Sequence, residues 1–134
     1  MTDSKFHFVI PSDYAHMREV QGQVMAAVAA HKFDDESCFA IKLALEEGLI
    51  NAIKHGNKLD AAKTVTVDAK VGDKLVEIVI QDQGVGFDRT SVPDPTDDQN
   101  LEKSSGRGLL LIEAYMTDVE YFDRGRRIRM VRRK

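Results

Sequence analysis

The chain has 134 residues and a mass of 15.0 kDa, the size of one ordinary domain, and its 43% hydrophobic and 31% charged residues are typical of a soluble globular protein. No apolar run approaches the roughly 20 residues that cross a bilayer. A single cysteine excludes a framework of internal disulfides. Because the sequence shows no secretory signal pattern, we expect a cytoplasmic protein. The formal net charge is −3, but the last eleven residues hold seven of the 19 basic side chains, so the acidic remainder is a poor surface for nucleic acid.

The first predicted elements are a strand and two helices. The strand covers residues 6–10 and ends at a proline and a serine. Ser12 or Asp13 can cap a helix that runs to about Ala30, with apolar residues along one side. A second helix is predicted over residues 36–55, where a glycine and an asparagine would end it.

The second half of the chain predicts two strands, a long loop, a helix and two more strands. These elements are expected at residues 65–71, 75–80, 84–106, 109–116, 119–122 and 128–131. Hairpins imply antiparallel pairing, and the helices must cover one face of the sheet. We therefore predict a single α/β domain over 1–134: a two-layer sandwich of a mixed, largely antiparallel sheet with helices on one face.

The second predicted helix has two distinct faces. Glu47, Asn51 and His55 are spaced i, i+4, i+8 and fall within roughly 80° on an α-helical wheel, opposite the apolar side. A solvated polar face explains such a pattern without any function. A zinc site is disfavoured because the other histidines lie in unrelated segments.

A first glycine motif, DQGVG at residues 82–86, follows the buried strand directly. Gly84 and Gly86 would let the backbone approach a ligand, and Asp82 places a hydrogen-bond acceptor where it needs a partner, such as an adenine amine. An EF-hand loop fits poorly, because its twelfth position would be Pro93 instead of glutamate. A simple turn remains an alternative, since glycine pairs mark many loops.

A second glycine pair follows the long loop. Gly106, Arg107 and Gly108 open the predicted helix at its N-terminus, where free N–H groups suit a phosphate. The chain has neither a P-loop motif nor the dinucleotide-binding glycine pattern after its first strand. A loop of this length inside one domain is typically a functional lid or disordered.

Taken in order, these motifs resemble the ATP-binding fold shared by DNA gyrase, histidine kinases and mismatch-repair ATPases. Within that superfamily, the string LALEEGLINAIKHG at residues 43–56 is similar to the anti-sigma-factor serine/threonine kinases of bacterial partner-switching systems. The resemblance extends from about Phe6 to Val131 and implies a histidine kinase-like ATPase fold with an ATP lid at residues 87–105.

The resemblance also implies a role for each matching position. Asn51 would hold Mg²⁺, and Glu47 would accept the proton of the attacking hydroxyl, while Glu46 points about 100° away and is disfavoured as the base. Asp82 would bind the adenine of ATP. The other implied nucleotide contacts are the glycines Gly84, Gly86, Gly106 and Gly108, with His55 and Lys54 in support and Lys103 or Arg107 at the γ-phosphate.

One segment departs from the family. Many relatives carry a threonine beside the adenine-binding aspartate, in a Gly-Thr-Thr-like stretch of the last strand, but here residues 125–128 read GRRI. We expect adenine recognition to be weaker or differently built in this chain.

The implied function is an ATP-dependent serine/threonine protein kinase that acts as an anti-sigma factor. It would sequester a sigma factor and phosphorylate an anti-anti-sigma (STAS-type) antagonist, as a homodimer that uses Mg²⁺ and contacts neither nucleic acid nor a membrane. The alternative is an ATP-binding sequestering module that regulates another partner without phosphotransfer. Nucleic-acid binding through the basic tail, residues 124–134, is a third and less favoured hypothesis.

Overall fold

The computed structural model describes residues 2–84 and 104–134, the side chains of 104–109 excepted. Its sheet is formed by β1 (Ser4–Pro11), β2 (Thr64–Val71), β3 (Leu75–Gln81), β4 (Asp118–Phe122) and β5 (Arg127–Arg133). Its helices are α1 (Tyr14–Ala30), α2 (Asp35–Ile50), the π-helix η1 (Asn51–Gly56), α4 (Ser104–Tyr115) and the 3₁₀ turn η3 (Asp123–Gly125).

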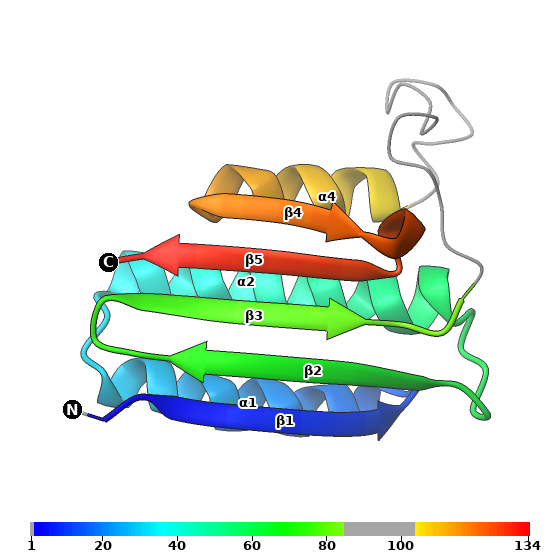
Figure 1. The fold of residues 1–134 in the computed structure, drawn as a ribbon, viewed down its shortest axis with the longest axis horizontal. Coiled ribbons are helices and arrows are strands. Elements are labelled where there is room, and N and C mark those ends of the chain that lie inside the picture. Colours follow the sequence, from blue (N-terminus) through cyan, green and yellow to red (C-terminus); the bar gives the residue numbers. More distant parts are fainter. Residues whose placement is uncertain (1, 85–103) are drawn as a thin grey trace.

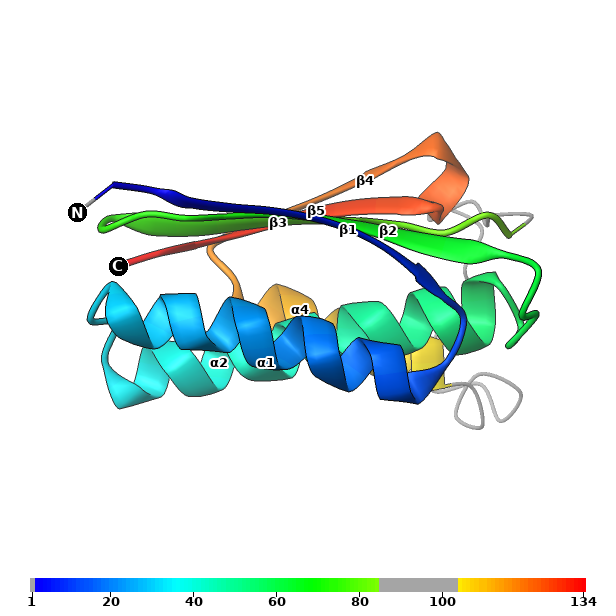
Figure 2. The same cartoon turned by 90° about the horizontal axis from the view of Figure 1, so that it is seen from below.

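The structure is a two-layer sandwich, as predicted. The strand order is β1-β2-β3-β5-β4, and all four pairings between neighbouring strands are antiparallel. Figure 2 shows α1, α2 and α4 together on one face of this sheet, with the opposite face uncovered. In the described parts of the chain, no helix is both long and apolar enough to cross a membrane.

The core lies between the sheet and the helix layer. Alternate residues of β2 and β3 point into it, including Val67, Ile78 and Ile80, and they meet the apolar side of α2. Gly48 lets α2 approach the sheet closely, because a Cβ at this position would lie 2.8 Å from Cδ1 of Ile80. The predicted apolar side of the second helix is therefore confirmed as its buried side.

Side-chain caps fix where the first two helices begin. Asp13 accepts a hydrogen bond from the backbone N–H of His16 (2.8 Å), and Asp34 accepts one from that of Ser37 (2.7 Å). Each carboxylate thereby satisfies an N–H group that the helix leaves unpaired, and it also faces the positive end of the helix dipole.

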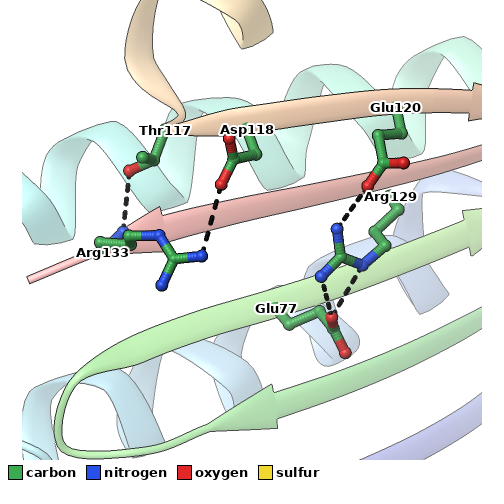
Figure 3. A network of polar contacts seen from close by, with 6 residues as sticks. All are labelled: Glu77, Thr117, Asp118, Glu120, Arg129 and Arg133. Atoms are coloured by element: carbon green, nitrogen blue, oxygen red, sulfur yellow. Dashed lines mark hydrogen bonds and ion pairs between the residues drawn. The ribbon is translucent and has the colours of Figure 1, made fainter.

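The uncovered sheet face carries a polar network across three strands (Figure 3). Arg129 of β5 contacts Glu120 of β4 through Nη1 (2.6 Å) and Glu77 of β3 through Nη2 (2.6 Å). Arg133 lies 3.6 Å from Asp118, further along the same strand pair. These side chains are partly exposed, so they fix strand register more than they add to the free energy of unfolding.

One predicted helix differs in type near its end, and another begins earlier than predicted. The second helix is not α-helical to His55, because it changes to a π-helix at Asn51. The helix after the loop begins at Ser104, five residues before the predicted 109. The predicted lid, residues 87–105, lies outside the described residues except for its last two positions, which belong to α4.

Candidate functional site

Segments that are far apart in the sequence meet at one end of the sandwich. Figures 1 and 2 show the end of β3, the π-helix η1, the start of α4 and the β4–β5 turn at this same end. α4 also packs against both α2 and η1. The helix with the polar face, the described part of the first glycine motif (residues 82–84) and the helix that contains the second glycine pair thus lie at the same end of the sandwich.

Glu47 lies in the last turn of α2 and is half-buried. Burial raises the pKa of its carboxyl above the ordinary range, and the neighbouring charge of Glu46 raises it further. Glu46 itself points towards α1, where its Oε1 lies 3.0 Å from Nη1 of Arg18. A half-buried carboxylate with a raised pKa has the character expected of a general base, and the role of Glu47 as that base stays a prediction.

Asn51 begins the π-helix one turn after Glu47. Its Oδ1 and Nδ2 atoms are both buried, and neither makes a hydrogen bond to any described residue. An unsatisfied buried carboxamide costs about 1–3 kcal/mol, so such a group usually has a partner. A carboxamide oxygen is a ligand type that Mg²⁺ accepts together with phosphate oxygens and waters, and the site fits this ion chemically.

The π-helix changes the geometry after Asn51. The N–H of Asn57 donates to the carbonyl of Ala52 at 2.8 Å, a hydrogen bond five residues apart instead of four. His55 therefore does not follow Asn51 at α-helical spacing, and the face predicted to be shared by Glu47, Asn51 and His55 stays a prediction. His55 is half-buried and lies next to Gly56, which touches the first glycine motif.

Gly56 and Gly84 bring η1 into direct contact with the segment after β3. A Cβ on Gly56 would lie 2.4 Å from the carboxylate carbon of Asp82, and a Cβ on Gly84 would lie 2.0 Å from the carbonyl oxygen of Gly56. Real Cβ atoms do not approach other atoms so closely, so both positions require glycine. The predicted close backbone approach at Gly84 is made to the protein's own helix.

Asp82 is buried at this contact. Its Oδ1 accepts a hydrogen bond from the N–H of Gly84 (2.8 Å), and its own N–H donates to the carbonyl of Arg126 (2.8 Å). Burial raises the pKa of the Asp82 carboxyl, although the Gly84 N–H and the positive charges of Arg126 and Lys63 oppose the rise. A buried carboxylate that accepts one hydrogen bond from the described residues keeps capacity for a further donor.

Asn57 links the site to three segments, a role that the sequence did not reveal. Its Nδ2 donates to Oγ of Ser12 (3.0 Å) and to the carbonyl of Thr64 (2.9 Å), and its Oδ1 accepts from the N–H of Gln83 (2.7 Å). The side chain is fully buried. We predicted this asparagine only as the end of a helix, because its partners lie in the segment after β1, in β2 and in the segment after β3.

Replacing Asn57 by alanine should lower the free energy of unfolding by about 3 kcal/mol, because three buried hydrogen bonds are lost together. Urea denaturation measures the change. Gln23→Ala, on the exposed side of α1, should leave the midpoint nearly unchanged. An Asn57→Ala midpoint equal to that of Gln23→Ala would show that the linkage does not stabilise the fold.

Arg126 is a second residue that the sequence did not single out. Its Nη1 lies 3.5 Å from the carbonyl oxygen of Gly84, and its Nη2 lies 2.8 Å from Oδ1 of Asp123. It stands in the GRRI stretch, where relatives were expected to carry threonine. The departure in sequence thus corresponds to a charged side chain beside Asp82.

The remaining predicted site residues are placed only in part. Gly106, Arg107 and Gly108 lie inside the first two turns of α4 instead of before it, because α4 starts at Ser104. Gly86 and Lys103 lie outside the described residues, and Lys54 is exposed. Over 2–84 and 104–134, no group of three or more histidine, cysteine or acidic side chains has the arrangement of a metal site.

Known proteins are similar to this chain over most of its length. The sequence matches the family described as histidine kinase-like ATPase domain over residues 10–132. It is 32% identical over 96 residues to an anti-sigma F factor of Clostridium perfringens, covering 67% of this chain and 68% of that protein. It is also 32% identical over 100 residues to the serine-protein kinase RsbW of Listeria monocytogenes, covering 69% of this chain and 64% of that protein.

A solved structure supports the fold alone. The crystal structure of the RsbU and RsbW domains of a Mycobacterium tuberculosis protein superimposes with a TM-score of 0.65 at 18% identity. The similarity covers 97% of this chain and 32% of that longer one.

Proposed function

Because the chain belongs to the family of histidine kinase-like ATPase domains, we propose that it is an ATP-dependent serine/threonine kinase that acts as an anti-sigma factor. It would hold a sigma factor inactive and phosphorylate a STAS-type anti-anti-sigma protein. The names of its relatives, anti-sigma F factor and serine-protein kinase RsbW, support this proposal. By resemblance we also expect a cytoplasmic homodimer that contacts neither nucleic acid nor a membrane.

One observation carries the proposal. The buried carboxamide of Asn51 makes no hydrogen bond within the described residues, and it lies one helical turn from a glutamate whose pKa is raised. The same helix ends against the buried Asp82. Three polar groups therefore lie along this helix and its contact with the segment after β3. They are a carboxylate that could act as a base, a carboxamide that could hold a metal ion, and a carboxylate that could bind an amine.

Each residue would have a separate task. Bound Mg-ATP would supply the transferable γ-phosphoryl group. Asn51 would ligate the ion, and Glu47 would orient the substrate hydroxyl and accept its proton. Asp82 would accept a hydrogen bond from the adenine amine, and the N–H groups at the start of α4 would face the phosphates.

Replacing Glu47 by glutamine should reduce phosphotransfer about 10²–10⁴-fold while leaving nucleotide affinity nearly unchanged, because only the proton acceptor is lost. Transfer of labelled phosphate from Mg-ATP to purified STAS-type proteins measures the rate. Glu46→Gln is the matched control, since Glu46 points to Arg18 instead of into the site, and it should retain transfer. Equal loss in both variants would contradict the assignment of Glu47.

The same variant has an expected effect on stability. A carboxyl with a raised pKa binds its proton more tightly in the folded state, so it stabilises the fold at low pH and costs stability above its unfolded pKa. Glu47→Gln should therefore melt at the same or a higher temperature than the unmodified protein at neutral pH.

The unmodified protein also distinguishes the kinase from the alternative function. If it captures partners but transfers no phosphate, it is a sequestering module that does no chemistry.

A further inference from the structure

The β4–β5 turn holds Arg126 against the segment that carries Asp82. Asp123 (φ 52°), Arg124 (φ 56°) and Gly125 (φ 81°) all adopt left-handed backbone conformations, which are unfavourable for the first two residues. After this turn the carbonyl of Arg126 accepts the N–H of Asp82 at 2.8 Å. The turn conformation thus brings Arg126 beside the end of β3.

The guanidinium of Arg126 is fixed on two sides. Asp123 accepts hydrogen bonds from its Nη2 through Oδ1 (2.8 Å) and from its Nε through the main-chain carbonyl (3.1 Å). On the other side, Nη1 lies 3.5 Å from the carbonyl oxygen of Gly84. The side chain is about one-third exposed (32%), so one edge of it borders the site.

The charges around Asp82 come from several elements. Arg126 and Asp123 face it from the β4–β5 turn with opposite charges, and Lys63 faces it from the loop before β2. Gly56 of η1 touches the carboxylate and contributes no charge. Burial raises the pKa of Asp82, while the Gly84 N–H, and then Arg126 and Lys63, act against that rise.

We propose that Arg126 is a positioning residue for the base end of the nucleotide site: it contacts the Gly84 carbonyl and places a positive charge beside Asp82, which would accept a hydrogen bond from the amine of a 6-aminopurine nucleotide. The inference rests on the proposed function. In the family that the sequence resembles, a threonine hydroxyl lies beside this aspartate. Here a guanidinium takes its place and acts through charge.

The charge leads to a pH dependence that a purely structural contact would not produce. A protonated Asp82 loses the charge-assisted hydrogen bond to the amine, which is about twice as strong as a neutral one. Without Arg126, less positive charge opposes the rise that burial causes in the pKa of Asp82, so Asp82 would begin to bind a proton at a higher pH. Nucleotide affinity should then fall earlier as the solution is acidified.

The test is calorimetric titration of the full chain with Mg-ATP from about pH 8 to about pH 5.5, the range just above the ordinary carboxyl pKa. Arg126→Gln should bind more weakly than the unmodified protein, and the ratio of the two dissociation constants should grow about threefold or more towards the acid end. Protonation of the nucleotide itself affects both proteins equally and cancels in this ratio. Thermal melting verifies that each variant is folded.

Two control variants separate charge from structure. Arg127→Gln removes the same charge from the next residue, whose guanidinium lies 5.7 Å from the Phe122 ring centroid, and its ratio should stay flat with pH. Arg126→Lys keeps the positive charge and should follow the unmodified protein at the acid end. A ratio for Arg126→Gln that does not change with pH would overturn the inference alone. A protein that binds no ATP at any pH would reject the proposed function as well.

Discussion

Replacing Gly84 by alanine is expected to lower the free energy of unfolding by about 2–3 kcal/mol, the upper part of the range for overpacked sites, and to abolish nucleotide binding. The added methyl group would lie 2.0 Å from the carbonyl oxygen of Gly56 and 2.6 Å from its carbon. Both are backbone atoms, so the segment that carries Asp82 must separate from the π-helix. Urea denaturation and Mg-ATP titration measure the two effects.

Gly22 provides the control for this substitution. It lies on an exposed position of α1, where an added Cβ would meet nothing within 4 Å. Gly22→Ala should stabilise the protein by about 0.5–1 kcal/mol, because alanine loses less backbone entropy in a helix. If Gly84→Ala unfolds at the same denaturant concentration as the unmodified protein, the contact between the two segments is not as close as described.

Replacing Asn51 by alanine should have opposite effects on stability and on ligand binding. The carboxamide is buried without a hydrogen bond in the described structure, so its removal should raise the free energy of unfolding by about 1 kcal/mol in the absence of nucleotide. The same variant should lose the increase in melting temperature that Mg-ATP gives the unmodified protein. Thermal unfolding with and without Mg-ATP measures both changes.

Asn57→Ala is the matched comparison for the stability of Asn51→Ala. Asn57 has the same side chain six residues later, but it makes three hydrogen bonds and should destabilise the protein when removed. A destabilised Asn51→Ala protein that still responds to Mg-ATP would show that Asn51 is an ordinary core residue and not a ligand.

The sequence predicted the sandwich and much of the site because each signal was local. Alternating valines marked β2, and capping aspartates marked the starts of α1 and α2. The glycine motifs marked the end of β3 and the region where α4 begins. The choice of Glu47 over Glu46 also followed from helical spacing, and the contact of Glu46 with Arg18 agrees with it.

The remaining features depend on contacts between distant segments. A wheel with 100° per residue cannot show that the helix widens to a π-helix at Asn51. Asn57 and Arg126 looked like a helix end and a turn residue, because the partners that reveal their roles lie more than 20 residues away or in another strand. Contacts between distant segments therefore determine which polar side chains of the site are held in place and which groups hold them.

We propose that the ends of α2 and β3, with the start of α4, form one site for Mg-ATP. Calorimetric titration of Mg-ATP into the unmodified protein and into Asp82→Asn tests this proposal, because asparagine keeps an oxygen for the Gly84 N–H but replaces the other, charged acceptor oxygen by an NH₂ donor. We predict saturable binding at one site per chain, weakened about 10–100-fold in Asp82→Asn by loss of a charged hydrogen bond. Equal affinity in both proteins, or no heat of binding in either, would contradict the account.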